Sequence, residues 1–544
     1  MMSFFLTPFV IIFVGTILAL VREKKRISSR QSQLIAFSFL VLLLILSVVL
    51  YYDILLWPFN FDGKPVAGSI WMFHTDYTGI YKRPTPPDSL SVNIWLIVPE
   101  FISFIMLLLY PLWMWASHRL TMIFIKRRRP KKGLPRVVIL GAGFAGLSAT
   151  RYLAEYPFEV KLVDKNNYHT FSPLLYQVGA AELAPHQIIA PLRSILRKQS
   201  NVSFLMGEVT GINFDDKTVY VGTKNEISYD YLIVALGSTP YFFGVPGASE
   251  NTFKLNSLDQ AIKLRNHILS CFEQAVQESN PDLRRSLLTF TIVGGGPTGV
   301  EFAGALCELV YGTLVKDYPT LDFKEVRIIL LEAIERLLLA MPEKIGNYTL
   351  QRLQKMGTEV HLNSIVSEIT SEAVYVKDGD KIPSKTIVWA AGSQGFPKAK
   401  EWGLETVARG QIKLLPTLQV PEHPNVYVTG DLAYFERDGK PLQMVAPVAV
   451  QQGKTAARNI LRELKGLELK KFSYFDRGTL AVIGRNKAAG QIRNLSFTGF
   501  FAWLVWLIVH IYYLIGFRNR LYVLTNWAWD YFLRDRIERL ILPC

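Results

Sequence analysis

Long apolar runs open the chain and set its first part apart from the rest. They cover 4–21, 34–52 and 94–117, and Glu100 in the third run is their only acidic or basic residue. Each run has about the length that an α-helix needs to cross a bilayer, so we predict three transmembrane helices. Glu100 is either a functional carboxyl within the membrane or a residue at its outer interface, and the pattern leaves both open.

Basic segments flank these runs unevenly. "VREKKRISSR" lies between the first two runs and "IKRRRPKK" follows the third, whereas the loop between the second and third is nearly balanced in charge. By the positive-inside rule, the N-terminus is outside and everything after Lys132 is on the cytoplasmic face. We therefore expect an integral membrane protein whose main body is cytoplasmic.

From Arg136 to about Lys465 the pattern changes to short apolar runs rich in β-branched residues, alternating with helical stretches. This alternation is typical of α/β layers. A strand followed by a glycine turn and a helix occurs twice, as "VVILGAGFAGLSA" and "TIVGGGPTGVEFAG". A second pair, "DYLIVALGSTP" and "KTIVWAAGSQG", also repeats. We predict two Rossmann-like dinucleotide-binding domains.

The domain boundaries follow from these changes of pattern. We expect the first dinucleotide domain to consist of 131–250 and 396–470, with the second inserted at 251–395. The transmembrane part then covers 1–130, and a C-terminal membrane-anchoring region covers 471–544.

Apolar character returns after Phe472, and hydropathy alone would make 495–517 a fourth span. A fourth crossing would place the basic "RNR" and "RDRIER" outside, against the positive-inside rule. We therefore predict an anchor that lies in the membrane interface; the alternative is a buried helical hairpin of the main body. The apolar residues of one predicted helical face are Trp529, Phe532, Leu533, Ile537, Leu540 and Ile541.

Composition supports a membrane partner. The 544 residues carry a net charge of +15 and half of them are hydrophobic. The basic residues cluster beside apolar runs, so an anionic membrane surface suits them better than nucleic acid. Cys271, Cys307 and Cys544 lie far apart, which indicates neither a disulfide framework nor a metal site.

The first glycine turn has the full context of a dinucleotide site. Gly141 permits the tight turn, Gly143 the approach of a pyrophosphate, and Gly146 the packing of the helix on its strand. Asp164 ends the next strand, where a carboxylate can accept both hydroxyls of a ribose. Lys165 and Gly237 complete the candidate cofactor contacts, and a purely structural turn is the alternative.

The second turn contains Gly294, Gly296 and Gly299, and its acid is Glu332. A carboxylate here favours NADH over NADPH, whose 2′-phosphate it repels. Arg336 lies close enough in sequence to weaken this preference, and an exposed structural acid is the alternative for Glu332. The candidate contacts of this site include one further residue, Gly392.

Two dinucleotide sites imply electron transfer between two dinucleotides. The simple pairing is a non-covalent FAD in the first site and a nicotinamide dinucleotide in the second. "NVYVTGDLA" supports this pairing, because Gly430 and Asp431 follow a strand where a short acid can reach the ribityl or pyrophosphate part of a flavin.

From about 135 to 540, the chain resembles the type II NADH dehydrogenases, the single-subunit NADH:quinone oxidoreductases. The motifs that carry this resemblance are "DKNNYHTFSPLLYQVG", "GGGPTGVEFAGALCEL", "NVYVTGDLA", "VAVQQGKTAARNI", "FDRGTLAVIGRNKA" and "AWLVWLIVHIYYLIGFRNRLYVLTNWAWDYF". The resemblance implies hydride transfer from NADH to FAD and reduction of a membrane quinone without proton pumping. It also implies a C-terminal part that seats the enzyme on the lipid bilayer, and a homodimer.

Three positions near the proposed reaction centre carry expectations from this resemblance. Glu301 is a catalytic candidate, with a helix-dipole role as the alternative. Gln451 and Gln452 match the quinone-site glutamines of the family pattern, with Gln451 the candidate donor to quinone, whereas Pro447 replaces the pattern's first glutamine. This departure puts the position of the quinone carbonyl donor in doubt.

Other features separate the chain from neighbouring classes and leave alternatives. "HTFSPLLYQVGAAELAP" contains no cysteine, which excludes the thiol relay of disulfide reductases at that place. The N-terminal runs are unusual for the family and suggest a membrane protein partner. The alternatives are a flavoprotein subunit or redox-sensing module of a larger complex, and an NADPH-preferring flavin oxidoreductase with another acceptor.

Overall fold

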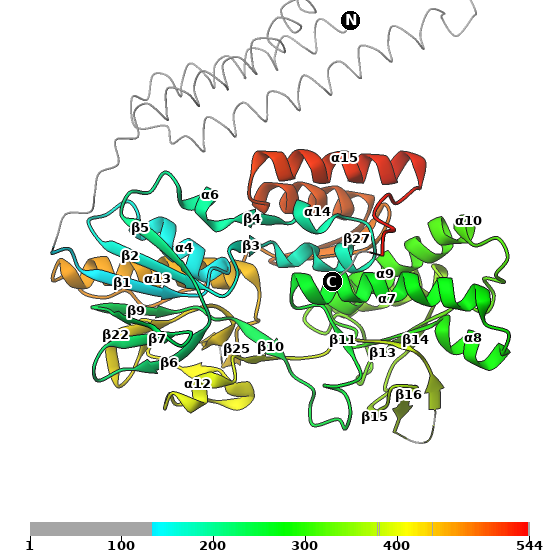
Figure 1. The fold of residues 1–544 in the computed structure, drawn as a ribbon, viewed down its shortest axis with the longest axis horizontal. Helices are drawn as coiled ribbons and strands as arrows, with labels where there is room; N and C mark the ends of the chain where they lie inside the picture. Colours follow the sequence, from blue (N-terminus) through cyan, green and yellow to red (C-terminus); the bar gives the residue numbers. More distant parts are fainter. Residues whose placement is uncertain (1–132, 378, 380, 438, 542–544) are drawn as a thin grey trace, which may run out of the picture. The chain divides into compact units, whose positions relative to one another are not determined.

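The computed structural model describes residues 133–541 apart from 378, 380 and 438 (Figure 1). The three predicted transmembrane runs, Glu100 and Cys544 lie outside the described residues.

A six-stranded sheet forms the first half of the body, in the order β21-β22-β9-β1-β2-β5. All neighbours pair in parallel except β21 and β22. Its strands are β1 (Arg136–Leu140), β2 (Glu159–Asp164), β5 (Val202–Met206), β9 (Tyr231–Val234), β21 (Gln419–Val420) and β22 (His423–Val428). The central strand β1 is almost entirely buried, as its continuous apolar sequence requires in a sheet covered on both faces.

Two helices cover one face of this sheet: α4 (Phe144–Leu153), directly after β1, and α13 (Ala446–Leu464), from far along the chain (Figure 1). They cross closely at Gly453, where an added Cβ would lie 2.1 Å from the carbonyl oxygen of Ala145. The crossing places the N-terminal end of α13 beside the first glycine turn.

The second sheet is fully parallel, in the order β11-β18-β12-β13-β14. Its strands are β11 (Phe253–Lys254), β12 (Thr289–Val293), β13 (Arg327–Leu331), β14 (Thr358–His361) and β18 (Thr386–Trp389). Its helices are α7 (Leu258–Gln277), α8 (Pro281–Leu287), α9 (Pro297–Cys307) and α11 (Glu343–Lys355). Both sheets thus begin a βαβ unit at a glycine turn, β1 to α4 and β12 to α9.

Short strands connect and extend the two sheets. The antiparallel pair β10 (Ser238–Pro240) and β19 (Ser393–Gly395) lies where the chain passes between the two sheets. Two antiparallel meanders project from the body: β6 (Val209–Asn213), β7 (Thr218–Val221) and β8 (Asn225–Ser228), and β15 (Val366–Ile369), β16 (Ala373–Val376) and β17 (Lys381–Pro383).

The described part of the chain also contains shorter elements. They are β3 (Tyr168–Thr170), β4 (Ile189–Pro191), α5 (Leu175–Gly179), α6 (Leu192–Leu196), α10 (Val315–Asp317), α12 (Lys398–Glu401), β20 (Ile412–Lys413), β23 (Ala433–Tyr434), β24 (Glu436–Arg437) and β25 (Lys440–Pro441), with 3₁₀ turns η1 (Ser172–Leu174), η2 (Pro185–Gln187), η4 (Ala408–Gly410) and η5 (Gly430–Leu432).

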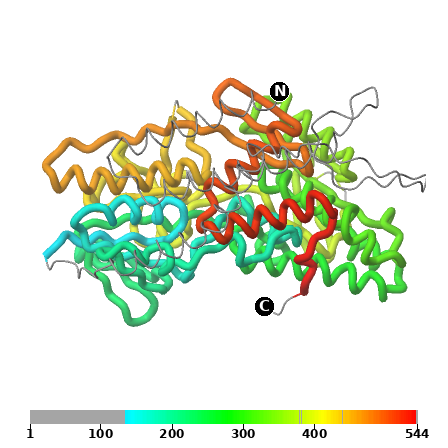
Figure 2. The backbone as a smooth tube through the Cα atoms, turned by 90° about the horizontal axis from the view of Figure 1, so that it is seen from above, coloured from blue at the N-terminus to red at the C-terminus, as the bar shows by residue number. Residues whose placement is uncertain are grey.

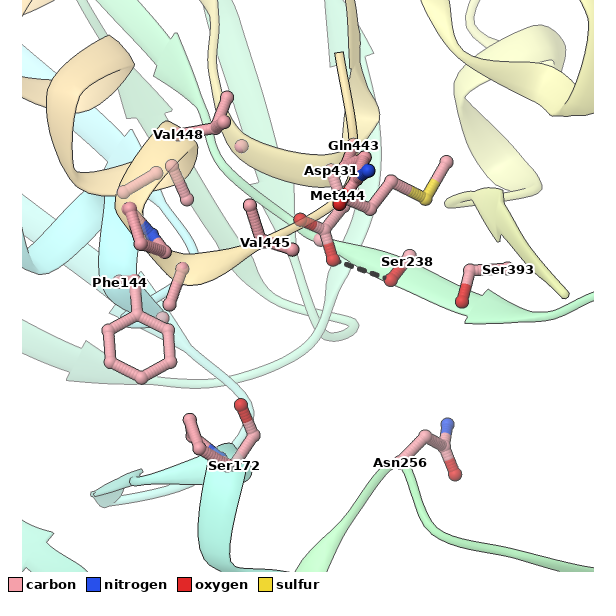
Figure 3. A pocket seen from close by; sticks show the side chains of 18 of the residues that line it. Phe144, Ser172, Ser238, Asn256, Ser393, Asp431, Gln443, Met444, Val445 and Val448 are labelled. Carbon is pink, nitrogen blue, oxygen red and sulfur yellow. Dashed lines mark hydrogen bonds between the residues drawn. The ribbon is translucent and has the colours of Figure 1, made fainter. Parts of the chain in front are cut away.

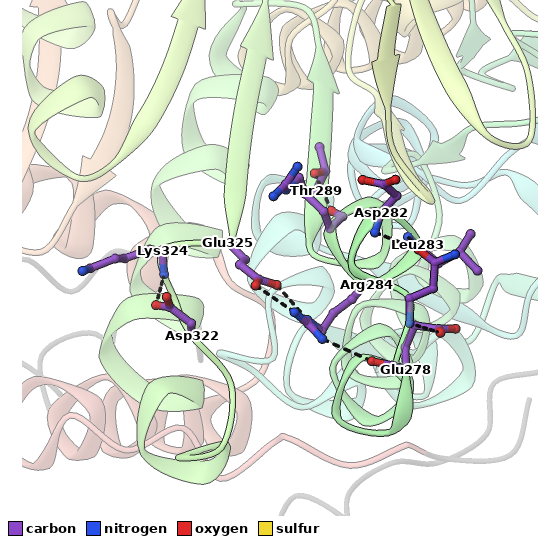
Figure 4. A network of polar contacts seen from close by, with 10 residues as sticks. Glu278, Asp282, Leu283, Arg284, Thr289, Asp322, Lys324 and Glu325 are labelled. Carbon is purple, nitrogen blue, oxygen red and sulfur yellow. Dashed lines mark hydrogen bonds and ion pairs between the residues drawn. The ribbon is translucent and has the colours of Figure 1, made fainter.

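Polar contacts connect helix α8 to the loop that precedes β13 (Figure 4). The guanidinium of Arg284 donates to both carboxylate oxygens of Glu325, at 2.8 and 2.9 Å, and also to the carbonyl oxygen of Glu278. The N-terminus of α8 is capped by Asn280, whose side chain accepts from two backbone N–H groups. The network therefore ties the loop that precedes β13 to helix α8.

The C-terminal region consists of a β-meander and two helices (Figure 2). The meander contains β26 (Thr479–Gly484), β27 (Lys487–Ile492) and β28 (Leu495–Gly499), followed by α14 (Phe500–Tyr513) and α15 (Phe517–Leu533). The apolar run 495–517 is therefore not one long helix. Helix α14 has 14 residues, about 21 Å at 1.5 Å per residue, which is too short to span a bilayer core.

The prediction that one helical face continues to Ile541 is wrong for the second half of its residues. Helix α15 ends at Leu533, and Arg534 has a left-handed backbone with φ of 51°. Residues beyond Arg534 form no regular helix, because the chain turns back onto the body there. All six apolar residues of the predicted face are nevertheless exposed.

Among the described residues, one helical stretch, Pro297–Asp317, has the length and hydropathy of a membrane span, and 67% of its most apolar window is buried inside the protein. It comprises α9, a π-helical segment η3 (Glu308–Leu314) and α10. Its burial and its position after β12 identify it as the core helix of the second dinucleotide unit.

Candidate functional site

The first glycine turn has the geometry of a pyrophosphate site. Gly141 has φ of +95°, and an added Cβ would lie 2.3 Å from the carbonyl oxygen of Ala235, so only glycine fits. At Gly143 an added Cβ would meet nothing within 4 Å, which leaves open space in front of the α4 N-terminus. Backbone N–H groups at a helix N-terminus favour an anion at this place.

Asp164 closes this turn from the end of β2. One carboxylate oxygen accepts from the backbone N–H of Ala142 at 2.6 Å and the other from that of Asn166 at 2.7 Å. Burial raises the pKa of Asp164, and these two bonds oppose the rise. Each carboxylate oxygen has two lone pairs, so both retain capacity to accept from ribose hydroxyls.

The second turn repeats this geometry residue by residue. Gly294 has φ of +111°, and Glu332 accepts from the backbone N–H of Gly295 at 2.6 Å and of Ile334 at 3.2 Å. At Gly296 an added Cβ would again meet nothing, whereas at Gly299 it would lie 1.9 Å from the carbonyl oxygen of Gly294. The two sites therefore have the same backbone design.

The Arg336 guanidinium is bound within its own loop. Its Nη2 donates to the carbonyl oxygen of Leu339 at 2.8 Å. Gly392 has φ of +71° and follows β18, in the small-residue turn that packs against Gly294. These positions leave the Glu332 carboxylate as the charged group at the end of β13.

A cavity of about 1950 Å³ begins at the first glycine turn and extends to α14 (Figure 3). This is well above the range of about 300–1,000 Å³ for ordinary ligand pockets, so it has room for a large cofactor and a second molecule. Residues from both dinucleotide units and the C-terminal region line it, among them Gly143, Asp164, Lys165, Gly237, Asp431, Glu301, Pro447 and His510.

Gly430 and Asp431 line this cavity, and Asp431 lies across the open space from Phe144 and Ser172 (Figure 3). Asp431 accepts a hydrogen bond from the Ser238 hydroxyl at 2.7 Å, and burial raises the pKa of this carboxyl. A flavin fits this wall: a glycine turn open toward the cavity at one end, and at the other a buried acid within reach of ribityl hydroxyls. Ser238 was not singled out from the sequence, although it directly follows Gly237.

Gln452 contacts this turn and not the cavity. Its side chain is buried, and its Oε1 accepts from the backbone N–H of Gly430 at 2.8 Å. The amide therefore fixes the conformation of Gly430, and we expect it to act on a cofactor through that turn.

Gln451 is engaged by a neighbouring loop. Its Nε2 donates to the carbonyl oxygen of Phe475 and its Oε1 accepts from the Phe475 backbone N–H, both at 3.0 Å. This pair of bonds closes the loop that leads into β26 over the start of α13. Gln451 Nε2 retains a second N–H group, but the residue is not among those that line the cavity.

Glu301 lies in α9, where the helix passes close to β26. An added Cβ at Gly304 would lie 2.0 Å from the carbonyl oxygen of Ile483, so glycine permits this approach. The Glu301 carboxylate accepts from the backbone N–H of Val482 at 3.3 Å. Burial raises the pKa of Glu301 to about 8, so the carboxyl is protonated at neutral pH.

Aromatic residues of α14 complete this part of the cavity. The indole of Trp506 lies beside Glu301 and lowers the pKa of its carboxyl slightly against the effect of burial. The imidazole of His510 stacks on Trp506 with ring centroids 3.9 Å apart. Neither residue was assigned a role from the sequence, although both belong to the quoted motif "AWLVWLIVHIYYLIGFRNR".

The buried cysteines take no part in this site. Cys271 lies against His267 and Thr386, and Cys307 Sγ is 3.1 Å from the Thr358 hydroxyl oxygen. Both are packed against the second sheet, and neither lines the cavity.

Comparisons with known proteins agree with this geometry. The family model "Pyridine nucleotide-disulphide oxidoreductase" matches residues 135–453, and "NDH2 C-terminal domain" matches 477–535. The chain is 40% identical to the type II NADH:quinone oxidoreductase Ndh of Mycobacterium tuberculosis, over 72% of this chain and 87% of that protein. It is 31% identical to the type II NADH:quinone oxidoreductase of Staphylococcus aureus, over 67% and 91%.

Two solved structures have the same fold. The Plasmodium falciparum NDH2 in complex with NADH superposes with a TM-score of 0.67 at 18% identity, covering 75% of this chain and all of that chain. The sulfide:quinone oxidoreductase of Aquifex aeolicus superposes with a TM-score of 0.58 at 17% identity, over 74% and 96%. On the sequence relationships and the C-terminal match, the chain belongs to the family of type II NADH:quinone oxidoreductases.

Proposed function

We propose that the protein is an NADH:quinone oxidoreductase in which NADH, bound at the second glycine turn, reduces an FAD bound at the first, and the flavin reduces a membrane quinone. The observation that carries this proposal is the single cavity joining the first glycine turn to Glu301 and α14. FAD supplies the redox chemistry, and the chain supplies binding, orientation and proton transfer.

The residues of the first site divide the work of holding FAD. The turn at Gly141, Gly143 and Gly146 receives the pyrophosphate, and Asp164, with Lys165 beside it, meets the adenosine ribose. Asp431, held by Ser238, meets the ribityl chain from the opposite wall.

The second site selects its substrate by charge. The Glu332 carboxylate repels a 2′-phosphate, and Arg336 is held by Leu339. NADH is therefore the preferred reductant.

Proton supply is the task of Glu301. Reduction of a quinone consumes two electrons and two protons, and hydride from NADH brings both electrons and one proton. A carboxyl that is protonated at neutral pH, beside the cavity, can supply the second. No step in this scheme moves a proton across a membrane, so we expect no proton pumping.

The C-terminal helices are the proposed seat on the membrane. Both helices carry exposed apolar residues, and those with the largest exposure on α14 are Phe500, Phe501, Leu504, Ile508 and Tyr512. The opposite face is buried through Trp506 and Trp527. A helix pair with one face on the body and the other apolar is suited to the bilayer interface.

The chain's other partners remain expectations from the sequence. We expect residues 1–130 to anchor the protein in the bilayer or to bind a membrane protein, with the body on the cytoplasmic face. We also expect a homodimer.

The decisive experiment uses the detergent-solubilised full chain. Its absorption spectrum should show bound flavin, NADH should bleach the flavin faster than NADPH, and a short-chain quinone should restore it. Absence of flavin, or flavin that NADH reduces and no quinone reoxidises, would overturn the proposal. The same assay on a chain lacking residues 1–130 separates catalysis from anchoring.

A further inference from the structure

His510 lines the cavity from α14, close to the groups that frame Glu301. Its ring is stacked on Trp506 and meets Phe171 edge to face, with centroids 6.2 Å apart. Phe171 and Tyr513 line the same cavity. The imidazole is thus held between two aromatic rings in one orientation, in the part of the cavity that α14 closes.

The hydrogen bond of one ring nitrogen determines the chemistry of the other. His510 Nδ1 lies 2.7 Å from the carbonyl oxygen of Trp506. A carbonyl oxygen only accepts, so Nδ1 carries the hydrogen and Nε2 presents a lone pair. Burial lowers the pKa of His510 to about 4, and the ring is therefore neutral throughout the physiological pH range.

We propose that His510 is a catalytic residue for quinone reduction, and that its Nε2 accepts a hydrogen bond from the hydroxyl group that forms on the quinone ring. The inference rests on the proposed function and deepens it. A quinone oxygen is only an acceptor, so Nε2 offers it nothing, whereas the quinol hydroxyl is a donor. The interaction therefore exists only once reduction has begun, which is the condition for lowering the barrier.

Electrons and protons balance while His510 stays neutral. Two electrons and one proton come from NADH, and the second proton leaves the Glu301 carboxyl for a quinone oxygen as the new O–H bond forms. Water then reprotonates Glu301. His510 accepts a hydrogen bond and takes no proton, and its Nδ1–H bond to Trp506 stays intact.

The test separates the two half-reactions by stopped-flow spectroscopy on the full-length holoenzyme. In His510→Phe, which keeps the aromatic stack, reduction of the flavin by NADH should stay within about twofold. Its reoxidation by a short-chain quinone should slow by about tenfold, the effect of losing one good hydrogen bond. Inhibition by added quinol should weaken by a similar factor, because the product loses the same bond.

Two further variants complete the test. His510→Gln provides an acceptor oxygen at a similar distance and should recover part of the reoxidation rate. His186→Phe makes the same change at an exposed histidine that does not line the cavity, and it should leave both half-reactions unchanged. Reoxidation and quinol inhibition at the original values in His510→Phe would overturn the inference. If His510→Phe binds no flavin, His510→Gln decides the question: reoxidation that is about tenfold slower with unaltered quinol inhibition would overturn the inference, and a smaller loss with weaker quinol inhibition would support it. Failure of the unsubstituted protein to reduce quinone would instead overturn the proposed function.

Discussion

The carboxyl of Glu301 owes its chemistry to neighbours distant in sequence. Gly304 brings α9 against β26, the backbone of Val482 provides one hydrogen bond, and α14 covers the rest. The bond to an N–H group favours the carboxylate, but burial is the larger effect and keeps the proton on. A neutral acid beside a redox cavity is suited to proton donation.

Replacement of this acid should remove one step from the pH profile. The rate of quinone reduction should fall as the pH rises through about 8, where Glu301 loses its proton. In Glu301→Gln the rate should be lower and this step absent, as measured by steady-state kinetics from pH 6 to 9.5. A step that persists in the variant would assign it to another group.

Stability should respond to the same group. The folded pKa of about 8 is above the ordinary 4.5, so the contribution of Glu301 to stability is present below about pH 4.5 and is lost as the pH rises through 8. Melting temperatures of the protein and of Glu301→Gln at pH 5 and pH 8.5 check this sign. The melting temperature of the variant, relative to that of the parent, should be higher at pH 8.5 than at pH 5.

The second site makes a separate prediction about selectivity. Glu332→Gln keeps an acceptor for the Gly295 N–H group but removes the negative charge, so kcat/KM for NADH should fall and that for NADPH should rise. We expect their ratio to change by about tenfold or more, as for loss of a charged hydrogen bond. Arg336→Leu is the control, and a large effect of this substitution on NADPH use would contradict the geometry.

At the scale of elements, one buried arginine holds the C-terminal segment on the body. Arg536 donates at 2.8 Å to the carbonyl oxygens of Ala180, at the end of α5, and of Ala305, in α9. It also pairs with Glu308 at 3.3 Å and Glu182 at 3.6 Å. Helix C-termini carry partial negative charge, so a guanidinium suits this junction. Burial nevertheless raises the pKa of Glu182 to about 8.

Loss of this junction should be costly. Arg536→Met removes a buried donor from the carbonyl oxygens of Ala180 and Ala305 and a cation from Glu308. Removal of one member of a buried pair costs about 3–5 kcal/mol. Urea denaturation measures the difference. Arg539→Gln is the matched control, because it breaks more exposed ion pairs with Asp317 and Asp535 and should cost about 0–1 kcal/mol. Equal losses of stability in both variants would contradict the inferred role of Arg536 in holding the C-terminal segment.

For the whole molecule, we expect the apolar face of α14 and α15 to be the side that meets lipid. Ile508 is 61% exposed on this face, whereas Leu283, 45% exposed, lies on α8. Leu283 is thus an exposed apolar position outside the proposed membrane face.

A fluorescent reporter should distinguish the two surfaces in the full chain. An environment-sensitive dye is attached through Ile508→Cys or through Leu283→Cys. In the full chain reconstituted into lipid vesicles, the emission of the dye at position 508 should shift to shorter wavelength, and the emission of the dye at position 283 should not. Cys271 and Cys307 are buried and unreactive, and Cys544→Ser removes the third thiol. Equal spectra at both positions would contradict the proposed membrane face.

Local pattern was sufficient for the βαβ units. Short-range periodicity and glycine stereochemistry predict the α/β layering, the strands before Gly141 and Gly294, and the acids that end the following strands. They do not predict the end of α15, because the turn at Arg534 is fixed by burial of Arg536 against α5 and α9. In the sequence, "RDRIER" reads as an ordinary solvated charge cluster.

Residue types at fixed spacing were enough to predict two dinucleotide turns, a candidate flavin-binding acid and an apolar C-terminal region. The orientation of the side chains around them depends on the fold. The Gln452 side chain accepts from the Gly430 backbone and does not enter the cavity. The His510 ring stacks on Trp506. Burial raises the pKa of Glu301 so that its carboxyl is protonated at neutral pH. Burial and cross-chain contacts determine orientation and pKa, and neither is written in local sequence.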